Sequence, residues 1–172
     1  MEFLGEINDK SLGIQSPEIY EYKVIKSARV ILFNDENKIA LMYVAKDKYH
    51  KLPGGSFERN EDLETALKRE VLEETGFGVQ KVGKEVGLIL EFRQDKDWET
   101  LYINYCSIAK ASNDQYNQQL TNFEKDHGFE LEWVTLDDAI DLISNEKPND
   151  YNGKFIVFRD TLFLKKIKEI LI

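Results

Sequence analysis

The chain has 172 residues, a formal net charge of −9, 42% hydrophobic residues and 12% aromatic residues. This length suits one domain with a sizeable core, and the composition is that of a globular chain rather than a disordered one. The negative charge argues against a nucleic acid held by electrostatics, but it allows a phosphorylated small molecule where metal ions neutralise the site locally.

The sequence carries no sign of export or of membrane insertion. The amino-terminal stretch MEFLGEINDK has neither a basic region nor a long apolar run, so we expect no secretory signal. No apolar run approaches the ~20 residues of a membrane span, so we expect no membrane partner. The single cysteine, Cys106, cannot form an internal disulfide and is expected in the core. We therefore expect a cytoplasmic protein.

Predicted strands occupy much of the chain. Residues 1–20 suggest a short strand and an irregular lead-in, and residues 24–45 predict a hairpin around the turn NDEN. Further strands are expected at EVGLILEFRQ, ETLYINYCSIAKA and FELEWVT, the first two joined by the turn DKDW. Residues 112–128 are polar and are expected to be mainly loop.

Helices are predicted between and after these strands. Asn60 is a candidate start and Gly76 a candidate stop for the first helix. Its apolar face is expected to consist of Leu63, Ala66, Leu67, Val71 and Leu72. The stretch LDDAIDLISN predicts a second helix, and residues 153–172 predict a carboxy-terminal one. The mixture predicts a mixed sheet flanked by helices, in a single domain over residues 1–172.

The first predicted helix gathers carboxylates on one side. Glu70, Glu73 and Glu74 have the spacing i, i+3 and i+4, so they share a face. Such a face is either simply solvated or offset by something cationic, because neighbouring like charges repel. Carboxylate oxygens suit Mg²⁺ or Mn²⁺, and Arg69 lies four residues before Glu73, where it can pair with it.

The spacing of these charges resembles the signature of the Nudix hydrolases. The stretch from Gly55 to Phe77, GSFERNEDLETALKREVLEETGF, matches G-x5-E-x7-R-E-U-x-E-E-x-G-U, where U is a bulky apolar residue. Every fixed position is met over these 23 residues, and the similarity of the surroundings extends over residues 24–145. One softer feature departs, because the family often has glycine where this chain has Asn60. Asparagine tolerates the same left-handed backbone.

This resemblance implies a fold and a set of site residues. The implied architecture is the α/β Nudix fold, a mixed sheet between helices with the signature as a loop–helix–loop. The implied ligands of Mg²⁺ or Mn²⁺ are Glu70, Glu73, Glu74 and the carbonyl of Gly54. Glu61 would help to hold a metal ion or its water, and Arg69 would orient a glutamate. Gly55 would let the backbone approach the diphosphate of the substrate.

The resemblance leaves two sources for the general base, the signature helix or a loop outside it. The loop candidate is Glu124, with Glu130 and Glu132 behind it, and an exposed loop carboxylate is the alternative interpretation of Glu124. Arg29 and Arg93 are candidates for binding substrate phosphates, with ordinary ion pairs as the alternative.

Other polar and aromatic residues have weaker claims. Trp98, Tyr102 and Tyr105 could stack a base, although burial in the sheet is the alternative for the tyrosines. His50 and His127 lack ligand spacing, so surface or hydrogen-bonding roles are expected for them.

Markers outside the signature narrow the substrate. The proline of ADP-ribose hydrolases, the tyrosine of dinucleoside polyphosphate hydrolases and the NADH motif are not found where those subfamilies carry them. Cys106 follows the signature, whereas isopentenyl diphosphate isomerases need a cysteine before it. Elimination favours a MutT-like hydrolase that converts nucleoside triphosphates, oxidised ones included, to monophosphate and pyrophosphate.

Two alternatives stay open. One is a diphosphatase acting on ADP-ribose or a nucleotide sugar, and the other is a nucleotide sensor that binds without cleaving. The expected partner is in each case a nucleotide-type small molecule. The resemblance also leaves a homodimer open.

Overall fold

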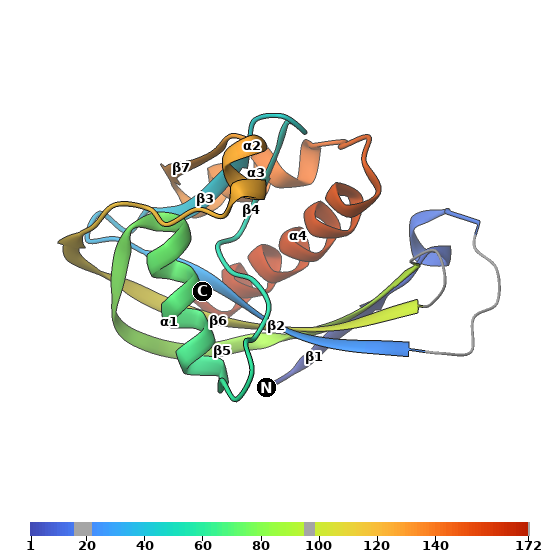
Figure 1. The fold of residues 1–172 in the computed structure, drawn as a ribbon, viewed down its shortest axis with the longest axis horizontal. Helices are drawn as coiled ribbons and strands as arrows, with labels where there is room; N and C mark the ends of the chain where they lie inside the picture. The colour runs from blue at the N-terminus through green and yellow to red at the C-terminus, as the bar shows by residue number, and fades with distance from the viewer. Residues whose placement is uncertain (16–21, 95–98, 172) are drawn as a thin grey trace.

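The computed structural model describes residues 1–15, 22–94 and 99–171. Within them, one mixed sheet has the strand order β1-β5-β6-β2-β3-β4, and β7 pairs with β3 (Figure 1). The strands are β1 (Phe3–Ile7), β2 (Tyr22–Phe33), β3 (Ile39–Val44), β4 (Tyr49–Lys51), β5 (Phe77–Gln94), β6 (Glu99–Gln115) and β7 (Phe129–Val134). The helices are the 3-10 helix η1 (Lys10–Leu12), α1 (Leu63–Thr75), α2 (Asn122–Asp126), α3 (Leu136–Asn145) and α4 (Tyr151–Leu171).

Helices cover both faces of the sheet. Apolar residues of α1 pack on one face in a cluster that comprises Ala28, Val30, Leu32, Ala40, Ala66, Leu67, Val71, Ala109 and Ala111. Helices α3 and α4 pack on the other face around a larger cluster that includes Ile31, Ile89, Ala139, Phe155, Phe163 and Leu164. Figure 1 shows α1 and α4 on either side of the strands. The predicted mixed sheet between helices is confirmed, and Cys106 is buried as expected.

The predicted hairpin is confirmed at residues 24–45, with a qualification. The amide of Asn34 donates to the carbonyl of Lys38 over 2.9 Å, and Asn37 adopts a positive φ of 57° that closes the turn. Only Phe33 and Ile39 are paired across β2 and β3, because the two strands take different partners. Strand β2 runs parallel to β6, and β3 pairs with β4 and β7.

The helix of the signature begins later than Asn60. Asp62 is its N-cap and accepts a hydrogen bond of 2.8 Å from the amide of Thr65, so α1 begins at Leu63. Asn60 has a φ of 67° in the preceding loop, and Glu61 lies in that loop rather than in the helix. The predicted stop is confirmed, since Gly76 has a φ of 74° and its amide donates to the carbonyl of Leu72.

The loop predicted over residues 112–128 is partly wrong. Strand β6 continues to Gln115, and α2 forms after Thr121. Thr121 and Glu124 form a reciprocal capping box, a local signal that was readable in the sequence TNFE. The turn DKDW lies outside the described residues, and α4 begins at Tyr151, two residues before the predicted start.

Candidate active site

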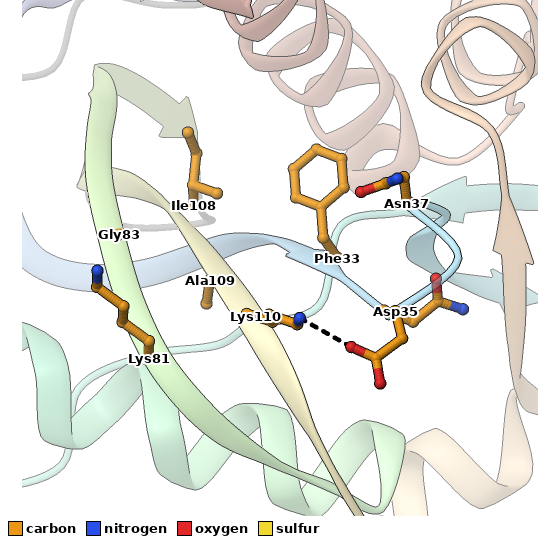
Figure 2. A pocket seen from close by; sticks show the side chains of 9 residues that line it. Phe33, Asp35, Asn37, Lys81, Gly83, Ile108, Ala109 and Lys110 are labelled. Carbon is orange, nitrogen blue, oxygen red and sulfur yellow. Dashed lines mark ion pairs between the residues drawn. The ribbon is translucent and has the colours of Figure 1, made fainter.

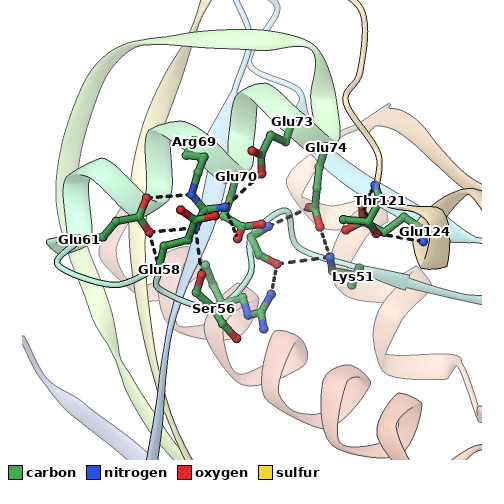
Figure 3. Close-up of polar contacts among 12 residues, drawn as sticks. Lys51, Ser56, Glu58, Glu61, Arg69, Glu70, Glu73, Glu74, Thr121 and Glu124 are labelled. Atoms are coloured by element: carbon green, nitrogen blue, oxygen red, sulfur yellow. Dashed lines mark hydrogen bonds and ion pairs between the residues drawn. The ribbon is translucent and has the colours of Figure 1, made fainter.

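A cavity of about 540 Å³ lies beside the glycine turn that precedes α1. The turn, α1, the β5–β6 pair, α2 and the first turn of α4 contribute to its wall. Its polar residues include the glutamates of the signature on one side and Arg29 and Arg93 on the other. Figure 3 shows the carboxylates of α1 pointing toward this turn and toward Lys51.

The two glycines of the turn are required by close contacts. Gly54 has a φ of +132°, and a Cβ there would collide with the backbone carbonyl of Ala28. A Cβ on Gly55 would lie 2.5 Å from Oε2 of Glu70 and 2.6 Å from its Cδ. The absence of side chains therefore lets the carboxylate of Glu70 lie directly against the backbone of the turn.

Arg69 binds three of the signature carboxylates. Its Nε donates to Oε1 of Glu61 over 2.8 Å, and its Nη1 donates to Glu70 over 2.8 Å and to Glu73 over 3.0 Å. Hydrogen bonds from Arg69 lower the pKa of Glu61 and keep that carboxyl ionised. The pairing of Arg69 with Glu73, suggested by their spacing, is therefore present, and Figure 3 shows the arginine between the carboxylates.

Glu74 is held separately, in a buried position beside the turn. Its Oε2 accepts a hydrogen bond of 2.9 Å from the amide of Gly54, and its Oε1 lies 2.5 Å from Nζ of Lys51. Burial raises the pKa of Glu74, and the ammonium of Lys51 opposes that effect. Lys51 also donates to the carbonyl of Gly54 over 3.3 Å. Sequence reasoning missed Lys51, whose only signal is its position directly before the turn LPGG.

The donor set fits a divalent metal ion in its chemistry. Four carboxylates and the carbonyl of Gly54 are hard oxygen ligands of the kind that Mg²⁺ and Mn²⁺ prefer. In the described part of the chain, however, no three His, Cys, Asp or Glu side chains converge into a metal-binding group. The reason is that the cations of Arg69 and Lys51 lie between the carboxylates.

The opposite wall of the cavity is cationic and aromatic. Arg29 of β2 donates to the carbonyl of Gly54, and burial together with Arg159 lowers the pKa of Arg29 to about 10. The guanidinium of Arg93 lies 4.7 Å from the ring centroid of Tyr102 and 5.1 Å from that of Phe155. Both arginines suggested from the sequence thus line the cavity together with the signature glutamates.

A buried ionic network lies beneath this wall. Arg159 of α4 is 0% exposed and binds Glu91 over 3.3 Å and Asp160 over 2.7 Å. Glu91 also binds Arg93, and Oδ2 of Asp160 accepts a hydrogen bond of 2.8 Å from the amide of Leu52. The network therefore joins α4 to both Arg93 and the glycine turn. Its signal in the sequence is the charged pair RD within the mainly apolar stretch FIVFRDTLFL of α4.

The base candidates are placed differently from one another. Glu124 lines the cavity, but its Oε2 accepts hydrogen bonds from the amide and hydroxyl of Thr121, over 2.7 and 2.8 Å. Glu130 is exposed outside the cavity, and Glu132 lies 3.4 Å from the ring of His50. Glu73 has a side chain that is 38% exposed and lines the cavity.

The weaker candidates mostly have structural contacts. His50 binds Glu146 over 2.5 Å through Nδ1, and Nδ1 of His127 donates to the carbonyl of Phe123 over 2.8 Å, so hydrogen-bonding roles are present for both. Tyr105 packs against Phe57 instead of lining the cavity. Trp98 lies outside the described residues.

A second, smaller cavity of about 260 Å³ lies at the β2–β3 turn (Figure 2). Phe33, Ile108 and Ala109 supply apolar wall, and Asp35 binds Lys110 over 2.8 Å. Asp35 is the one carboxylate among its described lining residues. The carboxylate-rich chemistry is therefore in the cavity beside α1.

Comparison with known proteins decides the family. A sequence model of the NUDIX domain matches residues 23–155. The chain belongs to the Nudix family. It is a hydrolase of this family, whose members act on nucleotide-type small molecules and generally use divalent metal ions. The resemblance seen in the sequence is thereby confirmed.

Individual relatives are distant. Diphosphoinositol polyphosphate phosphohydrolase 3-alpha of Mus musculus is 28% identical over 126 residues, 72% of this chain and 71% of the relative. Diphosphoinositol polyphosphate phosphohydrolase NUDT4B of Homo sapiens is 29% identical over 126 residues, 72% of this chain and 65% of the relative.

Solved structures share the fold. The MutT protein of Methanosarcina mazei Go1 superposes with a TM-score of 0.56 at 20% identity, covering 88% of this chain and 98% of that one. The MutT protein of Bacillus halodurans superposes with a TM-score of 0.54 at 20% identity, covering 78% of this chain and 80% of that one. Over the residues described here, no helix combines the length and apolar character needed to cross a bilayer.

Proposed function

We propose that this Nudix hydrolase cleaves nucleoside triphosphates to monophosphate and pyrophosphate with the help of Mg²⁺ or Mn²⁺. The observation that carries the proposal is the cavity in which the signature carboxylates face Arg29 and Arg93 across the glycine turn. Bound to the carboxylates, the metal would neutralise phosphate oxygens and lower the pKa of a water molecule. Glu70, Glu73, Glu74 and the carbonyl of Gly54 are the proposed ligands.

The protein's own residues have separate proposed roles. Arg69 orients Glu70 and Glu73, and Glu61 fixes the guanidinium of Arg69 from the loop before α1. The lack of a side chain at Gly55 lets the carboxylate of Glu70 lie against the turn, where Glu70 is proposed to hold the metal ion that binds the diphosphate. Arg29 and Arg93 bind phosphate oxygens from the opposite wall.

The reaction itself is a displacement at phosphorus. The oxygen of water forms a bond to phosphorus while the bond from phosphorus to the oxygen that bridges the α- and β-phosphates breaks. The proton of the water passes to a carboxylate, and the bridging oxygen leaves with one of the two products. Two carboxylates that line the cavity are proposed as the base, Glu73 on α1 and Glu124 on α2.

The charges of the cavity favour a nucleotide over an inositol polyphosphate. Its described lining has the cations Arg29, Lys51, Arg69 and Arg93 and the carboxylates Glu58, Glu70, Glu73, Glu74 and Glu124. Lys51, Arg69 and Arg93 are each paired with glutamates of the protein. A ring carrying many phosphates needs a surplus of cations, so the activity named for the mouse and human relatives is the second candidate rather than the first.

A substrate panel tests the proposal. The purified protein is incubated with nucleoside triphosphates, oxidised nucleotides, ADP-ribose, nucleotide sugars and a diphosphoinositol polyphosphate, each with Mg²⁺ or with EDTA. We expect EDTA-sensitive release of pyrophosphate and monophosphate from the triphosphates. Preferential cleavage of ADP-ribose, a nucleotide sugar or the inositol compound would replace the substrate assignment. Nucleotide binding without turnover of any compound would contradict the proposal and favour a sensor.

A further inference from the structure

Lys51 lies inside the carboxylate site, although it is not part of the signature. It is the last residue of β4, and its side chain is 8% exposed, beside Glu74 at 2%. Its Nζ is 2.5 Å from Oε1 of Glu74, 3.3 Å from the carbonyl of Gly54 and 5.1 Å from the ring centroid of Phe129. Figure 3 shows the ammonium of Lys51 joined by a dashed line to the carboxylate of Glu74.

The strand register explains this position. Lys51 pairs with Met42 across β3 and β4, and the chain then enters the turn that contains Gly54. The same turn places the amide of Gly54 on Oε2 of Glu74, so both oxygens of this carboxylate are bound by the protein. Lys51 therefore contacts two of the oxygens, on Glu74 and Gly54, that are proposed to bind the metal.

We propose that Lys51 is a positioning residue that holds Glu74 in place and competes with the divalent metal ion for the oxygens of Glu74 and Gly54. The inference rests on the proposed function, because it requires a metal ion at these oxygens. A divalent ion bound to Oε1 of Glu74 would lie close to the ammonium of Lys51, and the two positive charges would repel each other. The ammonium also cancels one negative charge of the site, which weakens its attraction for cations.

Metal affinity of the substituted protein tests the competition without using substrate. In Lys51→Met the side-chain length is kept and the charge is removed. We expect Mn²⁺ to bind at least about tenfold more tightly than to the wild type, because one cation fewer lies within contact of the ligands. Isothermal titration calorimetry with Mn²⁺, at one pH for all variants, measures this affinity.

The controls separate charge within the site from charge elsewhere. Lys68→Met removes the same charge from the exposed side of α1, where Lys68 pairs with Glu64 and is 49% exposed, so affinity should stay near that of the wild type. Lys51→Arg keeps the charge and should not tighten binding. In a Glu74→Gln background, Lys51→Met should tighten binding less than in the wild type, because the contact with the Glu74 carboxylate is already lost and the contact with Gly54 remains.

Each outcome has a definite meaning. Unchanged or weaker Mn²⁺ binding by Lys51→Met, with wild-type binding intact, overturns the inference and leaves the proposed function standing. Absence of Mn²⁺ binding by the wild type overturns both. If Lys51→Met does not fold, Lys51→Gln provides the same test, since its amide keeps a hydrogen bond to Glu74 without the charge. A purely structural lysine would weaken binding when replaced, whereas competition predicts tighter binding.

Discussion

Two arginines of this protein each gather carboxylates around one guanidinium, in opposite environments. Arg69 binds Glu61, Glu70 and Glu73 at the cavity in a partly exposed group. The side chains of Arg69 and Glu73 are 21% and 38% exposed, and those of Glu61 and Glu70 are 11% exposed. Arg159 binds Glu91 and Asp160 beneath α4, where all three side chains are 0% exposed. The first group lies within one loop and helix, and the second joins α4 to strand β5.

The difference in burial separates two tasks. Around Arg69, water or a metal ion can take the place of a lost partner, so these charges can change partners during catalysis. Around Arg159, a lost partner leaves its neighbours charged and desolvated, so the contacts stay as they are. The partly exposed group is therefore suited to chemistry, and the buried group holds the glycine turn and Arg93 in position.

The largest effect on stability is expected from the buried group. Replacing Arg159 with Leu leaves Glu91 and Asp160 without their cation, which should lower the free energy of unfolding by about 3–5 kcal/mol. Urea denaturation followed by circular dichroism measures the change. Lys165→Leu, at an exposed position of the same helix, is the matched control. A loss below about 1 kcal/mol in Arg159→Leu would show that this network does not support the fold.

The largest effect on activity is expected from the partly exposed group. Replacing Glu73 with Gln should reduce turnover at least about a hundredfold, because the residue is proposed to act at the metal or as the base. The free energy of unfolding should change by less than about 1 kcal/mol, since the side chain is 38% exposed. Pyrophosphate release and urea denaturation give the two values. Glu64→Gln, 60% exposed on the same helix, should leave both unchanged, and full activity of Glu73→Gln would refute the role of that residue.

A pH-dependent contribution is expected from His50, which lies between the two groups in burial. Burial disfavours the imidazolium, but hydrogen bonds and charges of Glu146 and Glu132 outweigh burial and raise the pKa of His50. Because the pKa of His50 is higher in the folded protein, its protonated ring stabilises the fold at pH values below the unfolded pKa of about 6.5. This stabilisation is lost as the pH rises through the pKa of the folded state. The melting temperature of wild type should therefore fall more between about pH 5.5 and 8.5 than that of His50→Gln. An equal fall in melting temperature for the two proteins would contradict this role of His50.

The smallest effect on stability is expected from an ion pair on the protein surface. Lys68 binds Glu64 over 2.6 Å one turn away, and both side chains are about half exposed, at 49% and 60%. Lys68→Met should change the free energy of unfolding by no more than about 0.5 kcal/mol, because exposed pairs are screened by water and salt. Urea denaturation measures this change. A decrease of several kcal/mol in the free energy of unfolding would mean that the exposure of an ion pair does not determine how much it stabilises this fold.

Local rules predicted the elements on which the site is built. The end of α1 at Gly76, the strand FELEWVT and the helix LDDAIDLISN follow from turn, strand and cap signals within a few residues. The errors are local as well. The N-cap of α1 is Asp62 and not Asn60. Helix α2, which begins with the capping box of Thr121 and Glu124, lies where a loop was expected. Both misses came from side chains that bond nearby backbone amides.

The sequence by itself determined the family and the carboxylate face of α1. The reason is that the helical period places Glu70, Glu73 and Arg69 together whatever the rest of the chain does. Only the tertiary structure decided the position of Lys51 beside Glu74 and of Arg159 beside Glu91. These partners are 23 and 68 residues apart, and strand register and helix packing bring them together. Such contacts depend on the whole fold, so no short stretch of sequence reveals them.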